Sequence, residues 1–590
     1  MDFFSILTLI GGLALFLYGM NAMGDGLAKV SGGKLEKILE NLTSSPIKAV
    51  LLGAGVTAVI QSSSATTVMV VGFVNSGIMK LSQAVGVIMG ANIGTTVTSW
   101  ILSLTGIQSD NFIIRMFKPT SFSPILAIIG VIFILFINDS KKKDVGTIFI
   151  GFAILMYGMD MMSSAVKPLA EVPEFTNLLL KFSNPLLGVL AGALLTAVIQ
   201  SSSASVGILQ ALCLTGAVPF SAAIPIIMGQ NIGTCITAIL SAIGAKKNAK
   251  RAAAVHLYFN LIGTVIFMTV FYIINAIVGF SFFHQSATPA GIAIIHSVFN
   301  ITATIILLPF AKGLEKLACL TIRDKKEDVA VVSAEDKEFM ILEPRFLEKP
   351  AFAVEQSRNA ARKMAEESHN ALFTALKLVD KYSEDDVERV QNMEAKVDRY
   401  EDELGTYLVK LSHKDISEAD SHSLSIMLHC IGDFERISDH AVNIKESAQE
   451  LHKKGLKFSA SAKKDLEILG EAVEDIVNTA YEVFDKQDMK LAEKIEPLEE
   501  VIDELSKEMK RRHVQRLRSG ECTIEMGFIL SDITTCLERV ADHCSNIGVC
   551  VTQVNEDLYD THSHLNTVKS HPDETFYREL EDARIKYQLS

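Results

Sequence analysis

A nine-residue stretch, TAVIQSSSA, occurs twice in this chain, at residues 57–65 and at residues 196–204. The same offset of 139 positions aligns LYGM at 17–20 with MYGM at 156–159 without a gap. Over the 40 positions that begin at each copy of the stretch, 19 are identical. The chain therefore contains a duplicated unit, and its fold must accommodate two similar halves.

The duplicated region is strongly apolar. Residues 1–320 contain 18 Lys and Arg against 11 Asp and Glu, whereas the remainder contains 37 against 57. We therefore expect an all-α protein with a polytopic membrane domain followed by an acidic soluble domain. Seven apolar runs are long enough to cross about 30 Å of hydrocarbon as helices, at about 3–22, 83–105, 122–138, 146–165, 221–243, 253–279 and 289–311.

Each copy carries a polar block inside its apolar sequence. The first serine block is Gln61, Ser62, Ser63 and Ser64, and the second serine block is Gln200, Ser201, Ser202 and Ser203. The apolar stretch 49–60 before the first block reaches only about 18 Å as a helix, which is too short to cross a bilayer. This favours a re-entrant hairpin of two short helices in each copy, while one long span with polar residues inside it stays open.

The charges of the loops do not decide between these two topologies. Both place the same number of basic residues on the cytoplasmic side, and both place the C-terminus there. They differ at KKK, residues 141–143, which only the hairpin topology places inside.

Polar groups inside a membrane need partners, and two matched blocks are better explained by a binding site than by helix packing alone. A second matched element, MGANIGTT at 89–96 and MGQNIGTC at 228–235, supplies mid-span oxygens that suit Na⁺, and helix N-termini at a break suit an anion. No Lys, Arg, Asp or Glu lies within 49–79 or 186–245. The sequence therefore predicts a site without fixed charge, in which an anion enters together with cations.

Three further polar features lie within the expected spans. The residues of HLYFN, His256 and Asn260, and those of HSVFN, His296 and Asn300, lie four apart on one helix face. For these pairs, hydrogen bonds between helices are favoured over a direct part in transport. Asp160 corresponds to Asn21 in the repeat, and an ion relay and a packing hydrogen bond both stay open for it.

Two serine blocks, each followed by G-x-N-I-G-T, resemble the type II sodium–phosphate cotransporter family, and specifically its bacterial members, over about residues 1–315. The resemblance implies two inverted repeats whose re-entrant hairpins form a site for phosphate and Na⁺. It implies that both serine blocks contact these ions, with Asn92, Thr95, Asn231 and Thr234 nearby. The second copy departs from the first at Gln230 and Cys235, where the first has Ala91 and Thr96.

The resemblance further implies sodium-coupled symport of inorganic phosphate across the bacterial plasma membrane, and no enzymatic activity. Phosphate export is an alternative, because some bacterial relatives are thought to work in that direction. A membrane-anchored phosphate sensor without transport is an alternative of another class.

The soluble half is also duplicated. ERISDHAVNI at 435–444 matches ERVADHCSNI at 538–547, and each copy contains two E-x-x-x-D pairs. Carboxylates four apart lie on one helix face, so two such helices could face each other around a metal ion. Ordinary charged faces that bridge helices are the competing interpretation. The candidate metal ligands are Glu394, Asp398, Glu435, Asp439, Glu499, Asp503, Glu538 and Asp542.

This half resembles the PhoU family over about 350–560. The resemblance implies two three-helix bundles, a divalent or iron-type metal at the E-x-x-x-D motifs, and a role in phosphate regulation in the cytoplasm. We expect phosphate, sodium ions and the lipid bilayer as partners, and no nucleic acid; a homo-oligomer or a phosphate-signalling partner stays open. The expected organisation is a membrane domain at 1–315 with repeats at about 3–138 and 142–277, a linker at 316–350, the PhoU-like domain at 351–560 and a tail at 561–590.

Overall fold

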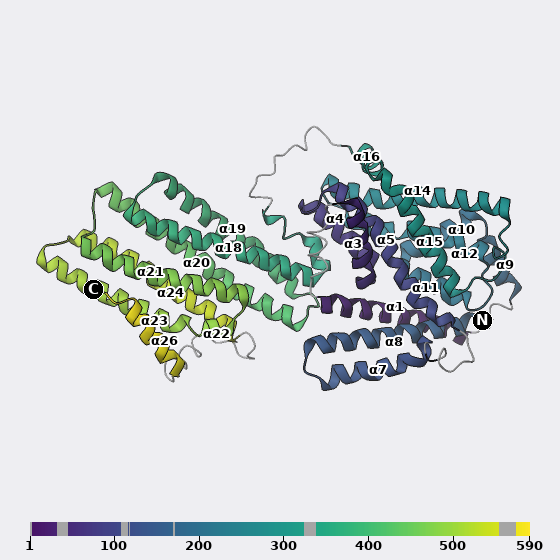
Figure 1. Cartoon of the computed structure of the whole chain (residues 1–590), viewed down its shortest axis with the longest axis horizontal. Helices are drawn as coiled ribbons and strands as arrows, with labels where there is room; N and C mark the ends of the chain where they lie inside the picture. Colours follow the sequence, from purple (N-terminus) through teal and green to yellow (C-terminus); the bar gives the residue numbers. More distant parts are fainter. Residues whose placement is uncertain are drawn as a thin grey trace. The chain divides into compact units, whose positions relative to one another are not determined.

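The chain forms two compact helical units in the computed structural model, Met1–Phe352 and Ala353–Ser590 (Figure 1). The structure describes residues 3–31, 45–107, 116, 118–168, 172–323, 338–553 and 574–589. Parts of the expected linker, 324–337, and of the expected tail, 561–573, lie outside these described residues.

The helices of the first unit are α1 (Phe3–Ser31), α3 (Pro46–Ile60), α4 (Ser63–Ser76), α5 (Leu81–Ser103), η1 (Leu104–Gly106), α7 (Pro119–Phe136), α8 (Ser140–Val166), α9 (Pro173–Lys181), α10 (Pro185–Ile199), α11 (Ser202–Cys213), α12 (Phe220–Gly233), α13 (Cys235–Ser241), α14 (Lys247–Val278), α15 (Pro289–Leu307), η3 (Leu308–Phe310), α16 (Ala311–Thr321) and η4 (Pro344–Glu348).

The second unit contains two similar helical copies. The first copy is α18 (Pro350–Asp380), α19 (Glu384–Ser412) and α20 (Glu418–Lys454). The second copy is α21 (Ala460–Lys486), α22 (Met489–Ala492), α23 (Ile495–Ser519) and α24 (Ile524–Gln553). A last helix, α26 (Glu574–Lys586), packs on α23 and is tied to it by an ion pair between Arg584 and Glu504.

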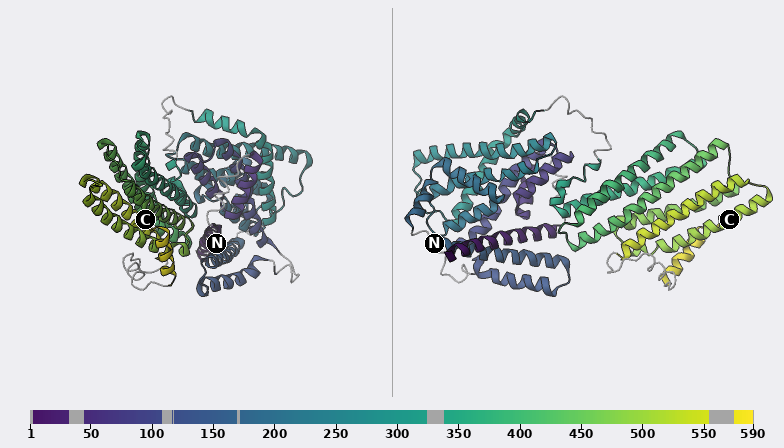
Figure 2. Two further views of the ribbon diagram at one scale, coloured as in Figure 1. Left: turned by 60° about the vertical axis from the view of Figure 1, so that its left-hand side comes forward. Right: turned by 180° about the vertical axis from the view of Figure 1, so that it is seen from behind.

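Six helical stretches of the described residues are long and apolar enough to cross a membrane, and a bent pair made of α9 and α10 could raise the number to seven. Six of the seven expected spans correspond to these stretches. The run expected at 122–138 forms α7, whose apolar part, Ser121–Phe136, is among the shorter apolar helices. Figures 1 and 2 show α7 lying along α8, and α8 lying along α1.

The first serine block interrupts a re-entrant hairpin. A Cβ on Gly86 of α5 would lie 3.1 Å from the Pro46 carbonyl oxygen, and one on Gly94 would lie 2.5 Å from that of Ala54. Residue numbers thus increase together along the contact, so α3 and α5 run parallel. Because α5 begins a short turn after α4 ends, the start of α3 and the end of α4 lie at the same level. The chain therefore enters through α3, breaks, and returns through α4.

The second copy repeats this arrangement. Gly229 of α12 lies against Val189 of α10, and Gly233 lies against Ala193, so these two helices also run parallel. Because α12 begins a short turn after α11 ends, α10 and α11 form a second hairpin. The contacts therefore favour the hairpin topology over a single span in both copies.

The two hairpins enter from opposite faces. The Lys246 amide, which precedes α14, donates a 2.8 Å hydrogen bond to Asn75 Oδ1 near the end of α4. Ser286, which follows α14, donates a 2.6 Å hydrogen bond to the Gly216 carbonyl oxygen just past the end of α11. With 32 residues, α14 is about 48 Å long and can cross a bilayer. The repeats are therefore inverted, as many secondary transporters are.

The face at the end of α4 also carries residues 338–352, because Asn75 donates a 2.7 Å hydrogen bond to Glu343. We call it the linker face. Helices α1 and α8 are antiparallel, since Gly12 lies against Met162 and Gly26 against Asp144. Phe16 contacts Gly207, which lies beyond the break toward the other face, whereas Gly24 faces the Ile60 carbonyl oxygen at the break. The start of α8, with KKK at 141–143, therefore lies toward the linker face.

This topology predicts opposite accessibility at two exposed positions. We expect Gln285→Cys, which lies beyond the far end of α14, to react with a membrane-impermeant maleimide in intact cells. Lys142→Cys should react only after permeabilisation, because it lies on the same face as the linker. Reaction of Lys142→Cys in intact cells, with Gln285→Cys protected, would contradict the arrangement.

Candidate functional site

The two helix breaks meet inside the first unit. The Ser64 hydroxyl donates a 3.3 Å hydrogen bond to the carbonyl oxygen of Gln200, which joins the two hairpin tips. Between them lies a cavity of about 290 Å³, here called the serine cavity. Both serine blocks line it, together with Met20, Asn21, Gly24, Asp25, Ile60, Ile199 and Lys349. The structure thus brings all eight residues of the two predicted blocks to one place.

Local backbone geometry explains why each helix stops at its glutamine. Gln61 has φ 59° and Gln200 has φ 59°, which is the left-handed region that rarely suits residues other than glycine. The Gln61 amide caps α3 by donating a 2.8 Å hydrogen bond to the Thr57 carbonyl oxygen. Ser62 then begins α4, because its hydroxyl accepts a 3.2 Å hydrogen bond from the Ala65 amide. One glutamine therefore ends a helix and the next serine starts another.

These breaks give the cavity groups of both signs. The N-terminal turns of α4 and α11 leave backbone N–H groups without partners within their own helices, and helix N-termini attract anions. The C-terminal turns of α3 and α10 leave carbonyl oxygens, which suit a hard cation such as Na⁺. The buried hydroxyls of Ser63, Ser202 and Ser203 add further donors. The arrangement can therefore solvate an oxyanion and a monovalent cation side by side.

The two tips are not equally rigid. Gln61 is only 8% exposed, and its Oε1 accepts a 2.9 Å hydrogen bond from Thr98 of α5. Gln200 is exposed, and Thr237, the repeat counterpart of Thr98, instead donates to the Thr234 carbonyl oxygen of its own helix. The first tip is therefore held to α5 in a way that the second tip is not held to α12 and α13.

The expectation of a site without fixed charge is wrong. Asp25 of α1 and Lys349, just before α18, both line the serine cavity. The charge-free windows around the blocks are real, but these two residues reach the cavity from distant parts of the chain. The sequence gave no local signal for either residue. Asn21 also lines the cavity, whereas its repeat counterpart Asp160 is not among the lining residues.

The second matched element lies outside the serine cavity. Asn92 donates a 3.1 Å hydrogen bond to Asn260, and Asn231 Oδ1 lies 3.4 Å from His296 Nε2. Glycines in this element do not break the helix, because α5 continues through Gly90 and Gly94 and needs them for its close approach to α3. Ion binding by Asn92, Thr95, Asn231 and Thr234 therefore remains a prediction.

A buried polar layer surrounds these residues. Both ring nitrogens of His256 and the hydroxyl of Thr234 have no hydrogen-bond partner among the described residues. The copies also differ here, since Gln230 donates a 3.0 Å hydrogen bond to the Ser205 carbonyl oxygen and Cys235 packs against Asn260. The hydrogen bond between Asn92 and Asn260 fits the expected packing role of the histidine and asparagine pairs.

In the second unit, the carboxylates of the first copy come close to one another. Burial and then the neighbouring Asp439 and Asp398 raise the pKa of Glu394, and burial and then Asp439 raise the pKa of Glu435. In the second copy, basic residues neutralise the acids: Lys507 pairs with Asp503 at 3.1 Å, and Lys510 pairs with Glu538 at 3.2 Å. No three candidate ligands among the described residues converge into a metal-binding group. The predicted metal role therefore stays a prediction.

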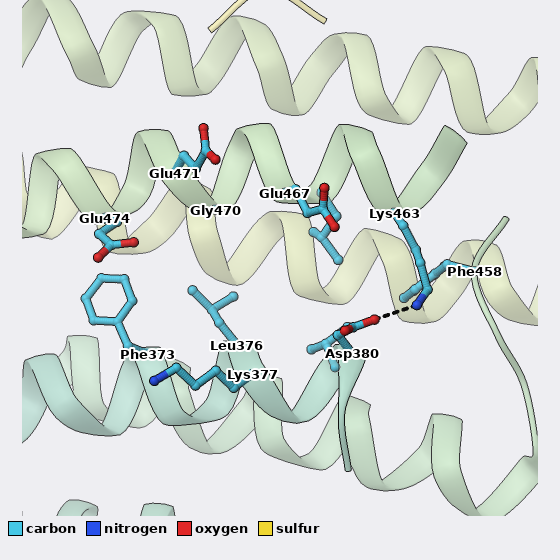
Figure 3. A pocket seen from close by; sticks show the side chains of 12 residues that line it. Phe373, Leu376, Lys377, Asp380, Phe458, Lys463, Glu467, Gly470, Glu471 and Glu474 are labelled. Carbon is cyan, nitrogen blue, oxygen red and sulfur yellow. Dashed lines mark hydrogen bonds and ion pairs between the residues drawn. The ribbon is translucent and has the colours of Figure 1, made fainter. Parts of the chain in front are cut away.

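A cavity of about 290 Å³ in the second unit lies between α18 and α21 (Figure 3). Asp380 and Lys463 form an ion pair at its edge. The charged lining residues are Lys377, Asp380, Lys463, Glu467, Glu471 and Glu474, so acids outnumber bases. This excess of negative charge disfavours phosphate, and the serine cavity remains the candidate anion site.

The fold and the serine cavity define a helical membrane protein with two inverted repeats, of the kind found among secondary transporters. The Na⁺/Pi-cotransporter family matches residues 15–164 and 154–286, and the PhoU domain matches residues 361–448 and 466–551. An uncharacterized protein of Bacillus subtilis, YqeW, is 32% identical over 315 residues, which cover 53% of this chain and 97% of that protein. The chain therefore belongs to the Na⁺/Pi-cotransporter family and carries a tandem PhoU region.

Two further relatives bear on its activity. An Escherichia coli K12 protein, "Putative inorganic phosphate export protein YjbB", is 24% identical over 522 residues, covering 87% of this chain and 91% of that protein. Rat "Sodium-dependent phosphate transport protein 2A" is 35% identical over 99 residues, covering 16% of this chain and 15% of that protein. No solved structure matches the chain significantly. The chain is thus a member of a phosphate transporter family and not an enzyme.

The unequal tips give a matched pair of substitutions. Thr98→Val removes the hydrogen bond to Gln61 and leaves a buried amide oxygen unsatisfied, which costs about 1–3 kcal/mol. We expect a lower thermal unfolding midpoint and weaker phosphate binding. Thr237→Val removes only a hydrogen bond within its own helix and should change both much less. Equal effects of the two substitutions would show that the first tip is not held by α5.

The shifted carboxyl in the second unit gives a test by pH. Because the pKa of Glu394 is raised in the folded state, the folded chain holds more protons than the unfolded chain just above the ordinary carboxyl pKa. Its contribution to stability therefore falls as the pH rises through that window, and Glu394→Gln should raise the thermal midpoint at pH 7 in chelator. The exposed Glu388→Gln on the same helix serves as the control. If the predicted metal role holds, Mn²⁺ should stabilise the wild type and not Glu394→Gln; no difference with Mn²⁺ would contradict that role.

Proposed function

We propose that this chain moves inorganic phosphate across the bacterial plasma membrane, with the serine cavity as its binding site and export as its direction. The observation that carries this proposal is the meeting of two oppositely entering hairpins at that cavity. Two helix N-termini and the donor groups of both serine blocks converge there. Phosphate presents several oxygen acceptors, and such an array of N–H and O–H donors matches them.

The inverted arrangement suits transport rather than binding alone. Each hairpin approaches the same cavity from its own face, so each face has an equivalent pair of short helices that can open or close. In related architectures, alternating access arises when one repeat rocks against the other around a fixed central site. The unequal attachment of the two tips makes the second tip the more mobile of the pair.

The direction of export rests on the relative named for phosphate export, which aligns along most of this chain. Physical chemistry makes that direction simple to drive. A membrane potential of about 100 mV, negative inside, favours the exit of an anion by about 2.3 kcal/mol per charge. Export therefore needs no sodium gradient, whereas import must offset this energy with accompanying cations.

Sodium-coupled uptake is the second candidate. It rests on the rat relative named as sodium-dependent and on the carbonyl-rich ends of α3 and α10. The presence of Lys349 at the cavity weakens the argument that cations must accompany phosphate, because one fixed positive charge is already there.

Serine substitutions test the proposed site. Ser63→Ala and Ser202→Ala should each reduce the flux of labelled phosphate in proteoliposomes by roughly tenfold or more, because each removes a buried donor at the anion site. Ser76→Ala, a buried serine near the other end of α4, should transport like the wild type.

Imposed gradients separate the candidate functions. Export predicts flux out of the compartment on the linker side without sodium, and that flux should increase when the potential there is negative. Uptake predicts flux that follows an inward sodium gradient. Phosphate binding without flux under any gradient would indicate a sensor and contradict transport. The PhoU region would then adjust this flux, which we expect to change when the region is deleted from otherwise intact protein.

A further inference from the structure

The charge of the serine cavity comes from outside the hairpins. Among the described residues that line it, Lys349 is the sole base and Asp25 the sole acid. Hydroxyls and amides can solvate phosphate, but a positively charged partner gives shorter and stronger hydrogen bonds to phosphate oxygens. Lys is a common phosphate binder because its ammonium group acts as a compact point charge with three donors.

Lys349 belongs to a segment that is packed firmly against the first hairpin. We call this segment, residues 338–352, the strap. Phe346 is fully buried, and its ring lies so close to Gly72 of α4 that a Cβ there would be 2.7 Å from a ring carbon. Phe346 also contacts Phe73 and Phe352, with ring centroids 5.4 and 4.9 Å away. Apolar contacts therefore fix the strap on both sides of Lys349.

Polar contacts hold the same segment in register. Glu343 accepts a 2.7 Å hydrogen bond from Asn75 near the end of α4, and it also forms an ion pair with Arg345. Arg345 in turn donates a 2.7 Å hydrogen bond to the carbonyl oxygen of Ser241 at the end of α13. The strap thus joins the first hairpin to the turn before α14. Four residues after Arg345, the chain places Lys349 at the serine cavity.

We propose that Lys349 is a phosphate-binding residue of the serine cavity, and that the docked strap positions it there from the linker face. This inference rests on the proposed function of that cavity. The charge that makes phosphate binding favourable is then supplied by the segment that leads directly into α18. A shift of the strap would withdraw the charge and weaken phosphate binding without altering either serine block.

Equilibrium binding of labelled inorganic phosphate to the full-length purified protein tests this role. Lys349→Gln should weaken phosphate binding about tenfold, and Lys349→Arg should keep most of the affinity, because the positive charge is retained. Lys312→Gln removes an exposed lysine of α16 that does not line the cavity, and it should bind phosphate like the wild type. Wild-type affinity in Lys349→Gln, or no rescue by Lys349→Arg, would overturn the inference.

A second substitution tests whether the strap positions the lysine. Arg345→Gln removes the link to Ser241 and should weaken phosphate binding in the chain that has Lys349. In Lys349→Gln it should have little further effect, because both changes act through the same charge. Fully additive losses would contradict a positioning role for the strap.

Two outcomes separate this inference from neighbouring ones. If Lys349 served only to neutralise Asp25, the double variant Asp25→Asn with Lys349→Gln would regain wild-type affinity, and the inference would be wrong. If the wild type itself bound no phosphate, the proposed function would fail first. If the wild type bound phosphate and Lys349→Gln bound it equally well, the proposed function would stand and only the role of Lys349 would fall.

Discussion

The break of two membrane helices at a glutamine is the feature on which the rest of the structure depends. Gln61 and Gln200 both adopt the left-handed conformation, and each is followed by a serine that caps a new helix. Without these breaks, no backbone N–H or carbonyl group would be available in the middle of the membrane. Duplication and inversion then bring the two breaks together, so that one cavity receives both sets of polar groups.

The cavity combines symmetric and asymmetric parts. The serine blocks and helix ends follow the repeat, whereas the charged residues do not, since Asp25 comes from α1 and Lys349 from the strap. The first tip is also held by Thr98, while its counterpart Thr237 bonds within its own helix. A transporter with inverted repeats needs two states of similar energy, and such unequal contacts are where those states can be distinguished.

Much of the fold could be predicted from the sequence because its signals are local. Twelve apolar residues before the first serine block cannot cross a bilayer, and this length argument correctly favours hairpins. The same reasoning placed Asn92 and Thr95 near the cavity, on the assumption that glycine loosens the helix there. In the structure, α5 continues through Gly90 and Gly94, because α3 packs against them too closely for any side chain.

The charge of the site could not be predicted for a different physical reason. Lys349 lies nearly 300 positions from the first serine block, and no periodicity or motif connects them. Its position depends on tertiary contacts of Phe346 and Arg345, which a single sequence does not reveal. Likewise, the spacing of the E-x-x-x-D pairs shows that carboxylates share a face, but not that Lys507 and Lys510 pair with them in the second copy.

The central claim is that one phosphate ion binds where the two helix breaks meet. Arsenate has the shape and charge of phosphate, and its anomalous scattering locates it in crystals without reference to any variant. The account predicts a single strong arsenic peak in each chain, within hydrogen-bond distance of both serine blocks. A peak elsewhere in the chain, with the serine cavity empty at saturating arsenate, would contradict it.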